Sequence, residues 1–196
     1  MTSILVVCTG NICRSPIAEG LLRNAMAARF GADAPTVSSA GMWGVEGSSA
    51  TPEAVAAAAE RGTDIGAHVA RRVSAMPPID DDLVIGMARE HRDALAETGG
   101  KVRDRVFTLK ELVRLLESLP PVGDGAGPDS LPGRVAEAAG ARHDGFAGNP
   151  RDEDVADPLG LPMQSYRAIA WELDEWVERL VDGLFGPVAV RAASEG

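Results

Sequence analysis

Short apolar segments alternate with longer amphipathic segments along most of the chain. The segments at residues 3–7, 36–40, 83–87 and 105–107 have the length and composition of strands, and the first is rich in β-branched residues. Between them, apolar residues recur at helical spacing. Strands that alternate with helices are typical of a parallel sheet covered on both faces. We therefore predict an α/β fold with three layers and four parallel strands.

Helix signals flank these strands. Ser15 is a favourable N-cap, Pro16 suits the first helical position, and Glu19 places negative charge in the first turn. Gly31 and Gly62 are stop signals for the first two helices. The predicted helices run from Ser15 to about Phe30, Thr51 to about Arg61, Arg89 to about Ala96, Leu109 to Glu117, and Met163 to Leu184, with a shorter piece at Arg134–Ala139.

The length of 196 residues and the hydrophobic content of 45% fit one domain with a full core. We assign residues 1–186 to this domain. Residues 119–154 are rich in loop-forming residues and are predicted to be an enlarged loop region that borders the active-site rim. Residues 187–196 are predicted to be a disordered tail. The last helix has one apolar face, which we expect to pack on the sheet.

Composition narrows the classes of function. The net charge of −10 argues against a nucleic-acid partner, because neutralising phosphates requires a basic face. No segment has the pattern of a signal peptide, and none approaches the roughly 20 apolar residues of a membrane span. The two cysteines lie five residues apart and form no disulfide framework, which fits a reducing cytoplasm. High Ala, Gly and Arg content suggests a bacterial source.

The segment from Cys8 to Pro16 carries the chemistry. It joins the first strand to the first helix, at the strand end where ligands bind in parallel sheets. Gly10 and Asn11 tolerate positive φ, so the loop can turn its N–H groups inward and form an oxyanion site with the helix N-terminus. Arg14 adds a planar fork that can bind two phosphate oxygens. The same groups favour a Cys8 thiolate, which is a nucleophile.

This pattern predicts phosphoryl transfer without a metal or a cofactor. The nucleotide-binding pattern Gly-x4-Gly-Lys-Ser/Thr is absent. Two other interpretations are weaker. Cys8 could be an inert core residue, and the two cysteines could bind zinc, but no second cysteine pair or nearby histidine completes a four-ligand site.

These residues resemble the low-molecular-weight protein tyrosine phosphatases, which are relatives of the thioredoxin-coupled arsenate reductases. The resemblance begins with the segment Cys8–Pro16 and extends over most of the chain. Further segments follow in the family's order, and they are Ser39–Gly41, Gly62 to Arg71, Asp82–Met87 and Asp157–Pro158. The resemblance implies a phosphatase-like three-layer fold and a cysteinyl-phosphate intermediate.

The resemblance also implies roles for individual residues. Cys8, Arg14 and Asp157 would be catalytic, with Asp157 as the proton donor. Ser39 and His68 would support the loop by hydrogen bonding toward Asn11 and Ser15, which keeps Asn11 in a left-handed conformation. The substrate-binding residues would be Thr9, Gly10, Asn11, Ile12, Cys13 and Ser15, with Trp43 as a candidate pocket wall.

Asp157 is also supported by its own context. Pro158 restricts the preceding residue to extended geometry, so Asp157 belongs in a loop, and a departing alkoxide or phenoxide requires a proton donor. Asp152, Glu153 and Asp154 are nearby acids without a following proline. The best-known family members have aromatic residues directly after this Asp-Pro pair, whereas this chain has Leu159 and Gly160.

Trp43 and Cys13 are each open to two interpretations. Trp43 either lines the pocket or is a partly buried structural residue. Cys13 either captures an oxidised Cys8 as a disulfide or merely fills the loop. His91 and His143 are expected to be solvated, with no metal ligands near them.

The sequence thus predicts a phosphomonoesterase, most specifically a protein tyrosine phosphatase, acting on a phosphorylated protein or a small phosphate ester. Two alternatives remain. One is an arsenate reductase that uses a low-molecular-weight thiol, because no cysteine follows Cys13 to relay electrons. The other is an inactive oxyanion-binding sensor or adaptor.

Overall fold

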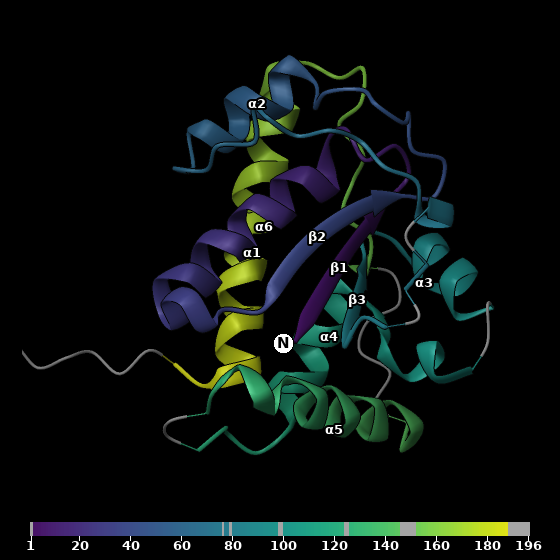
Figure 1. Cartoon of the computed structure of the whole chain (residues 1–196), viewed down its shortest axis with the longest axis vertical. Helices are drawn as coiled ribbons and strands as arrows, with labels where there is room; N and C mark the ends of the chain where they lie inside the picture. Colours follow the sequence, from purple (N-terminus) through teal and green to yellow (C-terminus); the bar gives the residue numbers. More distant parts are fainter. Residues whose placement is uncertain are drawn as a thin grey trace, which may run out of the picture.

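A computed structural model of the chain describes residues 2–75, 77–78, 80–97, 100–123, 126–145 and 152–187 (Figure 1). Its centre is a four-stranded parallel sheet in the order β2–β1–β3–β4. The strands are β1 (Ser3–Cys8), β2 (Thr36–Gly41), β3 (Leu83–Gly86) and β4 (Val106–Thr108). Every end of the predicted strands is confirmed to within one residue.

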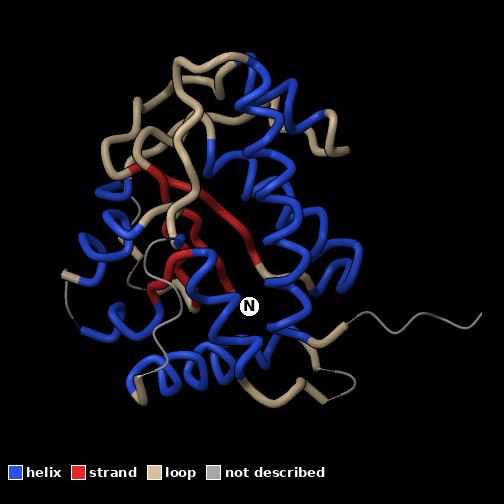
Figure 2. The backbone as a smooth tube through the Cα atoms, turned by 180° about the vertical axis from the view of Figure 1, so that it is seen from behind, coloured by secondary structure: helices blue, strands red, loops and turns tan. Residues whose placement is uncertain are grey.

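Helices cover both faces of this sheet, as the alternating pattern predicted (Figure 2). One face packs on α3 and on the 3-10 helices η2 and η3, whereas the other α-helices share the core of the opposite face. The helices are α1 (Arg14–Phe30), α2 (Pro52–Ala59), α3 (Arg89–Ala96), α4 (Leu109–Ser118), α5 (Leu131–His143) and α6 (Met163–Phe185), and the 3-10 helices are η1 (Gly31–Asp33), η2 (Val73–Ala75), η3 (Gly100–Arg105) and η4 (Pro128–Ser130).

Strand β1 lies between β2 and β3 and contributes to both cores. Ile4 and Val6 point to one face, and Leu5 and Val7 point to the other, because successive side chains of a strand alternate. All four side chains are completely buried. The chain leaves β1 toward β2 on one side and later returns to β3 on the other, so Cys8 lies at the switch point of the sheet.

Helix α1 begins one residue earlier than predicted. The N–H of Ile17 donates to the Cys13 carbonyl, which makes Cys13 the N-cap and Arg14 the first helical residue. The prediction of Ser15 as N-cap is therefore wrong, and Glu19 lies beyond the first turn. Pro16 is tolerated at the third position, because the first N–H groups of a helix have no partner within the helix.

The region 119–154 contains a longer helix than predicted. Helix α5 lies at the end of the sheet where the strands begin (Figure 1), and Arg142 from this helix donates to the Val106 carbonyl at 2.8 Å. The helix is therefore far from the Cys8 end. Val155 and Asp157, which contact Arg14, follow this region, and the prediction that the region borders the active site stays a prediction. Parts of the region, and the predicted tail from residue 188, lie outside the described residues.

Helix α6 packs mainly against α1 and α4 rather than directly on the sheet. Its buried face includes the predicted residues Ile169, Leu173, Val177, Leu180 and Leu184. In the described part of the chain, no helix combines the length and apolar character that crossing a bilayer requires.

The contact between α6 and α4 generates a stability test at Gly183. A Cβ atom at this position would lie 2.9 Å from Leu116 Cβ, whereas a Cβ at Gly140 in α5 would meet nothing within 4 Å. Gly183→Ala should therefore lower the free energy of unfolding by about 1–3 kcal/mol. The matched control Gly140→Ala should raise it by up to about 1 kcal/mol through helix propensity. Urea unfolding of both variants measures the difference, and equal stabilities would contradict this packing.

Candidate active site

Cys8 ends β1 at the base of the loop that leads into α1. We call residues 8–15 the phosphate loop. The Cys8 side chain is buried, and its Sγ accepts the backbone N–H of Asn11 at 3.3 Å and lies 3.0 Å from Ser15 Oγ. Because Ser15 Oγ accepts a hydrogen bond from Asn11, the Ser15 hydroxyl proton is free to point at the sulfur. Two donors thus face Cys8 Sγ.

Asn11 gives the phosphate loop its shape. Its φ of 57° is the only positive value of a non-glycine residue in the described part of the chain. The side-chain amide donates to Ser15 Oγ at 2.9 Å and to Ser39 Oγ at 2.8 Å, and its oxygen accepts the Arg71 N–H at 2.9 Å. All hydrogen-bonding atoms of this completely buried amide are therefore used. Gly10, the other candidate for positive φ, does not adopt it.

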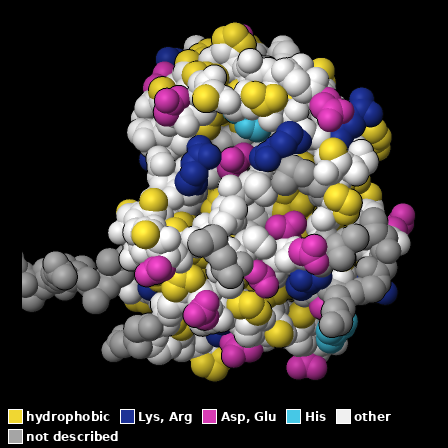
Figure 3. Space-filling model, in the orientation of Figure 1, with side chains coloured by type: hydrophobic (Ala, Val, Ile, Leu, Met, Phe, Trp, Pro, Cys, Tyr) yellow, Lys and Arg dark blue, Asp and Glu magenta, His cyan; other side chains and the backbone are white. Residues whose placement is uncertain are grey.

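Glu19 and His68 extend this network toward the surface. Ser39 donates to Glu19 Oε2 at 2.6 Å, and His68 Nε2 lies 2.8 Å from the Asn11 carbonyl oxygen. Glu19 and His68 line a polar hollow of about 320 Å³ behind the phosphate loop. Figure 3 shows the face with this hollow, where basic, acidic and histidine side chains gather. The family resemblance implied the contacts of Ser39 and His68 with Asn11, but it did not include the contact between Ser39 and Glu19.

Arg14 lies almost completely buried between the phosphate loop and the chain after α5. Its Nη1 donates to the Val155 carbonyl at 3.1 Å, and its Nη2 donates to Thr9 Oγ1 at 3.0 Å and to Asp157 Oδ2 at 2.5 Å. The Nε atom is buried and has no hydrogen-bond partner in the described structure. A buried donor without a partner is costly, and an oxyanion bound beside Arg14 would satisfy it.

Asp157 lies in the segment that we call the acid loop (residues 152–161). Its Oδ1 accepts the Leu159 N–H at 3.1 Å, which forms a local turn after Pro158. The carboxyl group is 42% exposed and pairs with Arg14, which is only 5% exposed. The structure therefore brings the three predicted catalytic side chains, Cys8, Arg14 and Asp157, together at one end of the sheet.

The neighbouring acids are engaged elsewhere. Ion pairs join Asp152 to Lys110 and Arg114, Glu153 to Arg92, and Asp154 to Arg89. Hydrogen bonding and charge from Lys110 lower the pKa of Asp152. Partial burial acts in the opposite sense on Asp154, but Arg89 lowers the pKa of this carboxyl as well. Burial raises the pKa of Glu153, which pairs with Arg92. Of these four acids, Asp157 is the one whose carboxyl pairs with Arg14 of the phosphate loop, which favours it as the proton donor.

His91 contradicts the prediction of a solvated histidine. Its side chain is completely buried, and its Nε2 lies 3.0 Å from Thr9 Oγ1. Burial and then the positive charge of Arg14 lower the pKa of His91 to about 4. A lone histidine in an otherwise polar helix segment gave no signal of this position in the sequence. His143 is largely exposed, as expected.

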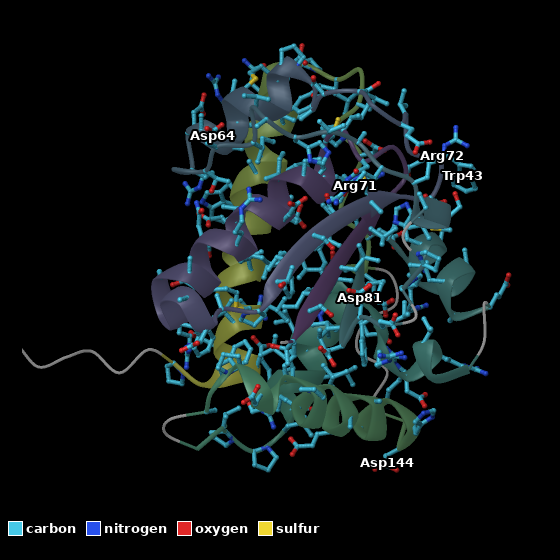
Figure 4. The ribbon with its side chains drawn as sticks, viewed as in Figure 1. Trp43, Asp64, Arg71, Arg72, Asp81 and Asp144 are labelled. Carbon is cyan, nitrogen blue, oxygen red and sulfur yellow. The ribbon has the colours of Figure 1, made fainter. Side chains whose placement is uncertain are left out.

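Trp43 follows β2 and lies beside the phosphate loop. Its N–H donates to the Thr9 carbonyl at 2.9 Å, and its side chain is 65% exposed, so it is not a partly buried structural residue. Figure 4 shows Trp43 near Arg72 at the edge of the molecule. Gly41 permits the close approach of β2, because a Cβ there would lie 2.8 Å from the Thr9 carbonyl oxygen. Ile12 is partly buried against the core.

Cys13 is a buried free thiol, as is Cys8. Its Sγ lies 3.7 Å from Thr51 Oγ1, and its S–H donates to the Tyr166 hydroxyl oxygen at 3.9 Å. Burial raises the pKa of the Cys13 thiol, so it is less reactive than an ordinary cysteine. Its predicted redox role stays a prediction.

Comparison with known proteins agrees with this geometry. The profile of the low molecular weight phosphotyrosine protein phosphatase family matches residues 3–118. The chain is 31% identical over 184 residues to a protein-arginine-phosphatase of Geobacillus stearothermophilus, which covers 92% of this chain and 95% of that protein.

Two solved structures are similar over nearly the whole chain. A low molecular weight protein tyrosine phosphatase from T. tengcongensis has a TM-score of 0.69 and 30% identity, covering 94% of this chain and 100% of that one. A cysteine-to-serine mutant of the YwlE arginine phosphatase, with a phosphorylated active-site serine, has a TM-score of 0.66 and 31% identity, covering 93% and 95%. The chain belongs to the low molecular weight phosphotyrosine protein phosphatase family and is a phosphatase of that family.

Proposed function

We propose that this chain is a protein tyrosine phosphatase that forms a phosphoryl-cysteine intermediate on Cys8. The observation that carries the proposal is the combination of a buried thiol under two hydrogen-bond donors with a buried guanidinium that has an unpartnered Nε atom. This arrangement can hold a tetrahedral oxyanion above a sulfur nucleophile. The cysteine-to-serine mutant of a relative carries a phosphorylated active-site serine, which supports an attack from this position.

In the first step, the Cys8 thiolate attacks phosphorus while Arg14 and the loop N–H groups hold the other oxygens. The S–P bond forms as the bond between phosphorus and the leaving oxygen breaks. Arg14 is paired with Asp157 in the free protein. A phosphate dianion at Arg14 would displace this carboxylate, which would then take up a proton from solvent and donate it to the leaving oxygen.

In the second step, the Asp157 carboxylate takes a proton from the water that attacks the phosphoryl group. The S–P bond breaks, inorganic phosphate forms, and the thiolate is the leaving group. Ser15 Oγ lies 3.0 Å from Cys8 Sγ, so its hydroxyl can stabilise the departing thiolate.

The side chains around the phosphate loop favour an aromatic substrate. Trp43, Val45 and Leu159 are all more than half exposed, and the first two donate backbone N–H groups to carbonyls of the loop. Together with Ile12, they offer apolar surface for the phenyl ring of phosphotyrosine. Phosphoarginine carries a planar array of polar nitrogen atoms, which requires hydrogen-bond acceptors. Asp157, which pairs with Arg14, is committed to proton transfer in this mechanism.

A protein-arginine-phosphatase is the second candidate. The relative that covers 92% of this chain has that activity by name, so the specificity has to be decided by experiment. The two candidates share the nucleophile, the oxyanion site and the acid, and they differ only in the group that leaves.

A direct comparison of matched phosphotyrosine and phosphoarginine peptides tests the proposed specificity. We expect kcat/KM for phosphotyrosine to exceed that for phosphoarginine by at least about tenfold, because a single apolar contact is worth roughly this factor. Cys8→Ser is the inactive control for both peptides, and arsenate with a low-molecular-weight thiol is a further arm. A preference for phosphoarginine would contradict the tyrosine assignment, and turnover by Cys8→Ser would contradict the covalent mechanism.

Asp157→Asn tests the proton donor. A general acid matters most for a poor leaving group, so this variant should slow phenyl or alkyl phosphates by about 100-fold or more. Aryl phosphates with strongly electron-withdrawing groups should be slowed far less. Single-turnover phosphorylation rates across a leaving-group series measure the effect, with Asp154→Asn as the matched control. Equal slowing across the series, or a leaving-group dependence in Asp154→Asn instead, would remove Asp157 from this role.

Two substitutions at Asn11 separate its backbone and side-chain contributions. Asn11→Gly loses the amide contacts but tolerates a φ of 57°, whereas Asn11→Ala loses the contacts and also strains the backbone. Both variants should lose activity, and Asn11→Ala should be less stable than Asn11→Gly by about 1 kcal/mol. Urea unfolding and steady-state kinetics are the measurements. Full activity of Asn11→Gly would show that the side-chain network is dispensable.

A further inference from the structure

We propose that His91 is a positioning residue of the phosphatase reaction, because it holds the Arg14 guanidinium in place through the Thr9 hydroxyl. The inference rests on the proposed role of Arg14 in binding phosphate oxygens. It concerns a residue from α3, outside the phosphate loop and the acid loop.

Arg14, Thr9 and His91 are connected by two successive polar contacts. Arg14 Nη2 donates to Thr9 Oγ1 at 3.0 Å, and the same oxygen lies 3.0 Å from His91 Nε2. A guanidinium can only donate, so Thr9 must accept from Arg14. His91 Nε2 is the second polar contact of this oxygen. In one neutral tautomer the ring accepts the Thr9 proton, and in the other its N–H donates to the second lone pair of Oγ1. The imidazole thereby orients the hydroxyl with a lone pair toward Arg14.

Thr9 differs from the other hydrogen-bond partners of Arg14 because it lies outside the acid loop. The structure shows three partners in all, and two belong to the acid loop, namely the Val155 carbonyl and the Asp157 carboxyl. The proposed acid has to leave Arg14 when substrate binds. Thr9 is then the anchor that fixes Nη2 independently of the acid loop, and Thr9 is itself fixed by His91.

Close packing between β3 and α3 fixes the position of His91. Helix α3 starts three residues after β3 and brings His91 under the phosphate loop, where its side chain is completely buried. This close approach depends on Gly86, because a Cβ there would lie 3.2 Å from His91 Cβ and 3.0 Å from the Arg92 nitrogen. A residue held this tightly can transmit a fixed geometry to Thr9.

The environment keeps the imidazole neutral. Burial and the charge of Arg14 both disfavour the imidazolium, and together they lower the pKa of His91 to about 4. The acids that face it, Asp157 and Asp154, have a smaller opposing effect. Glu90 from the same helix is 65% exposed and lies 3.5 Å from Nε2. At neutral pH, His91 therefore adds no second positive charge beside Arg14.

The test compares His91→Leu, His91→Gln and Thr9→Val in the full chain. His91→Leu keeps an apolar bulk but loses the polar contact with Thr9, and it should lower kcat for an aryl phosphate by about tenfold or more, since misplacing a catalytic group is costly. His91→Gln restores a polar group that can contact Thr9 and should recover most of this loss. Exposed His143 is the matched control, and His143→Leu should leave kcat unchanged.

A double-mutant cycle separates positioning from a merely structural role. Because His91 and Thr9 would act through the same series of contacts, combining Thr9→Val with His91→Leu should lower kcat little more than either change alone. Additive losses in kcat, or a His91→Leu enzyme within twofold of the parent, would overturn the proposal. Thr9→Val leaves the core histidine intact, so the same loss is measurable even where His91→Leu fails to fold.

Binding of inorganic phosphate and vanadate gives a readout that does not need turnover. Titration calorimetry should show weaker binding of both anions in His91→Leu and Thr9→Val, and recovery in His91→Gln. If the parent protein hydrolyses neither phosphotyrosine nor phosphoarginine, the proposed function fails, but these affinities still test the anchor. Unchanged anion affinity in both variants would reject the role of His91.

Discussion

The shape of the active site depends on one buried side chain that stabilises its own backbone in an unfavourable conformation. Asn11 has a left-handed φ of 57°, and its amide contacts Ser15, Ser39 and the Arg71 N–H. These partners come from α1, β2 and the segment after α2, so three separate parts of the fold determine one dihedral angle. A left-handed residue turns its neighbours' N–H groups to one side, which is how an anion site can be built from backbone alone.

The acid loop is held by a different kind of force. The three acids before Asp157 are anchored by ion pairs to basic side chains of α3 and α4, and the Val155 N–H donates to the Met87 carbonyl after β3. The phosphate loop is thus stabilised by buried neutral hydrogen bonds, and the acid loop mostly by charge pairs nearer the surface. Arg14 is the link between them, because it contacts both Thr9 and Asp157.

The sequence predicted the sheet, its helices on both faces and the central loop, because these depend on short-range patterns. The apolar strand before Cys8 and the helix after it are each formed by consecutive residues, so their patterns are visible in the sequence. The start of α1 was misplaced by one residue because Ser15, a favourable cap, serves Cys8 and Asn11 instead. Local propensity does not reveal such a tertiary use.

His91 and Glu19 could not be found from the sequence for a related reason. Their importance comes from burial beside Thr9 and Ser39, which lie 82 and 20 residues away along the chain. A histidine between charged residues of a short helix has the local pattern of a surface residue. Likewise, the length of α5 was underestimated, because Pro132 and two glycines lower the helical signal in a segment that tertiary packing stabilises.

In the free protein, the Asp157 carboxylate occupies Arg14 and so competes with phosphate for the guanidinium group. The carboxylate already satisfies Nη2 when no ligand is bound, so an incoming anion gains only the difference between its own contacts and those of Asp157. The apparent affinity for an oxyanion that binds Arg14 would therefore be the intrinsic affinity of the loop reduced by the fraction of molecules in which the pair is open. In the proposed mechanism, the same competition would act after hydrolysis, when the returning carboxylate would help to expel inorganic phosphate. A tethered anion can in this way limit product inhibition without any change in the loop that binds the substrate.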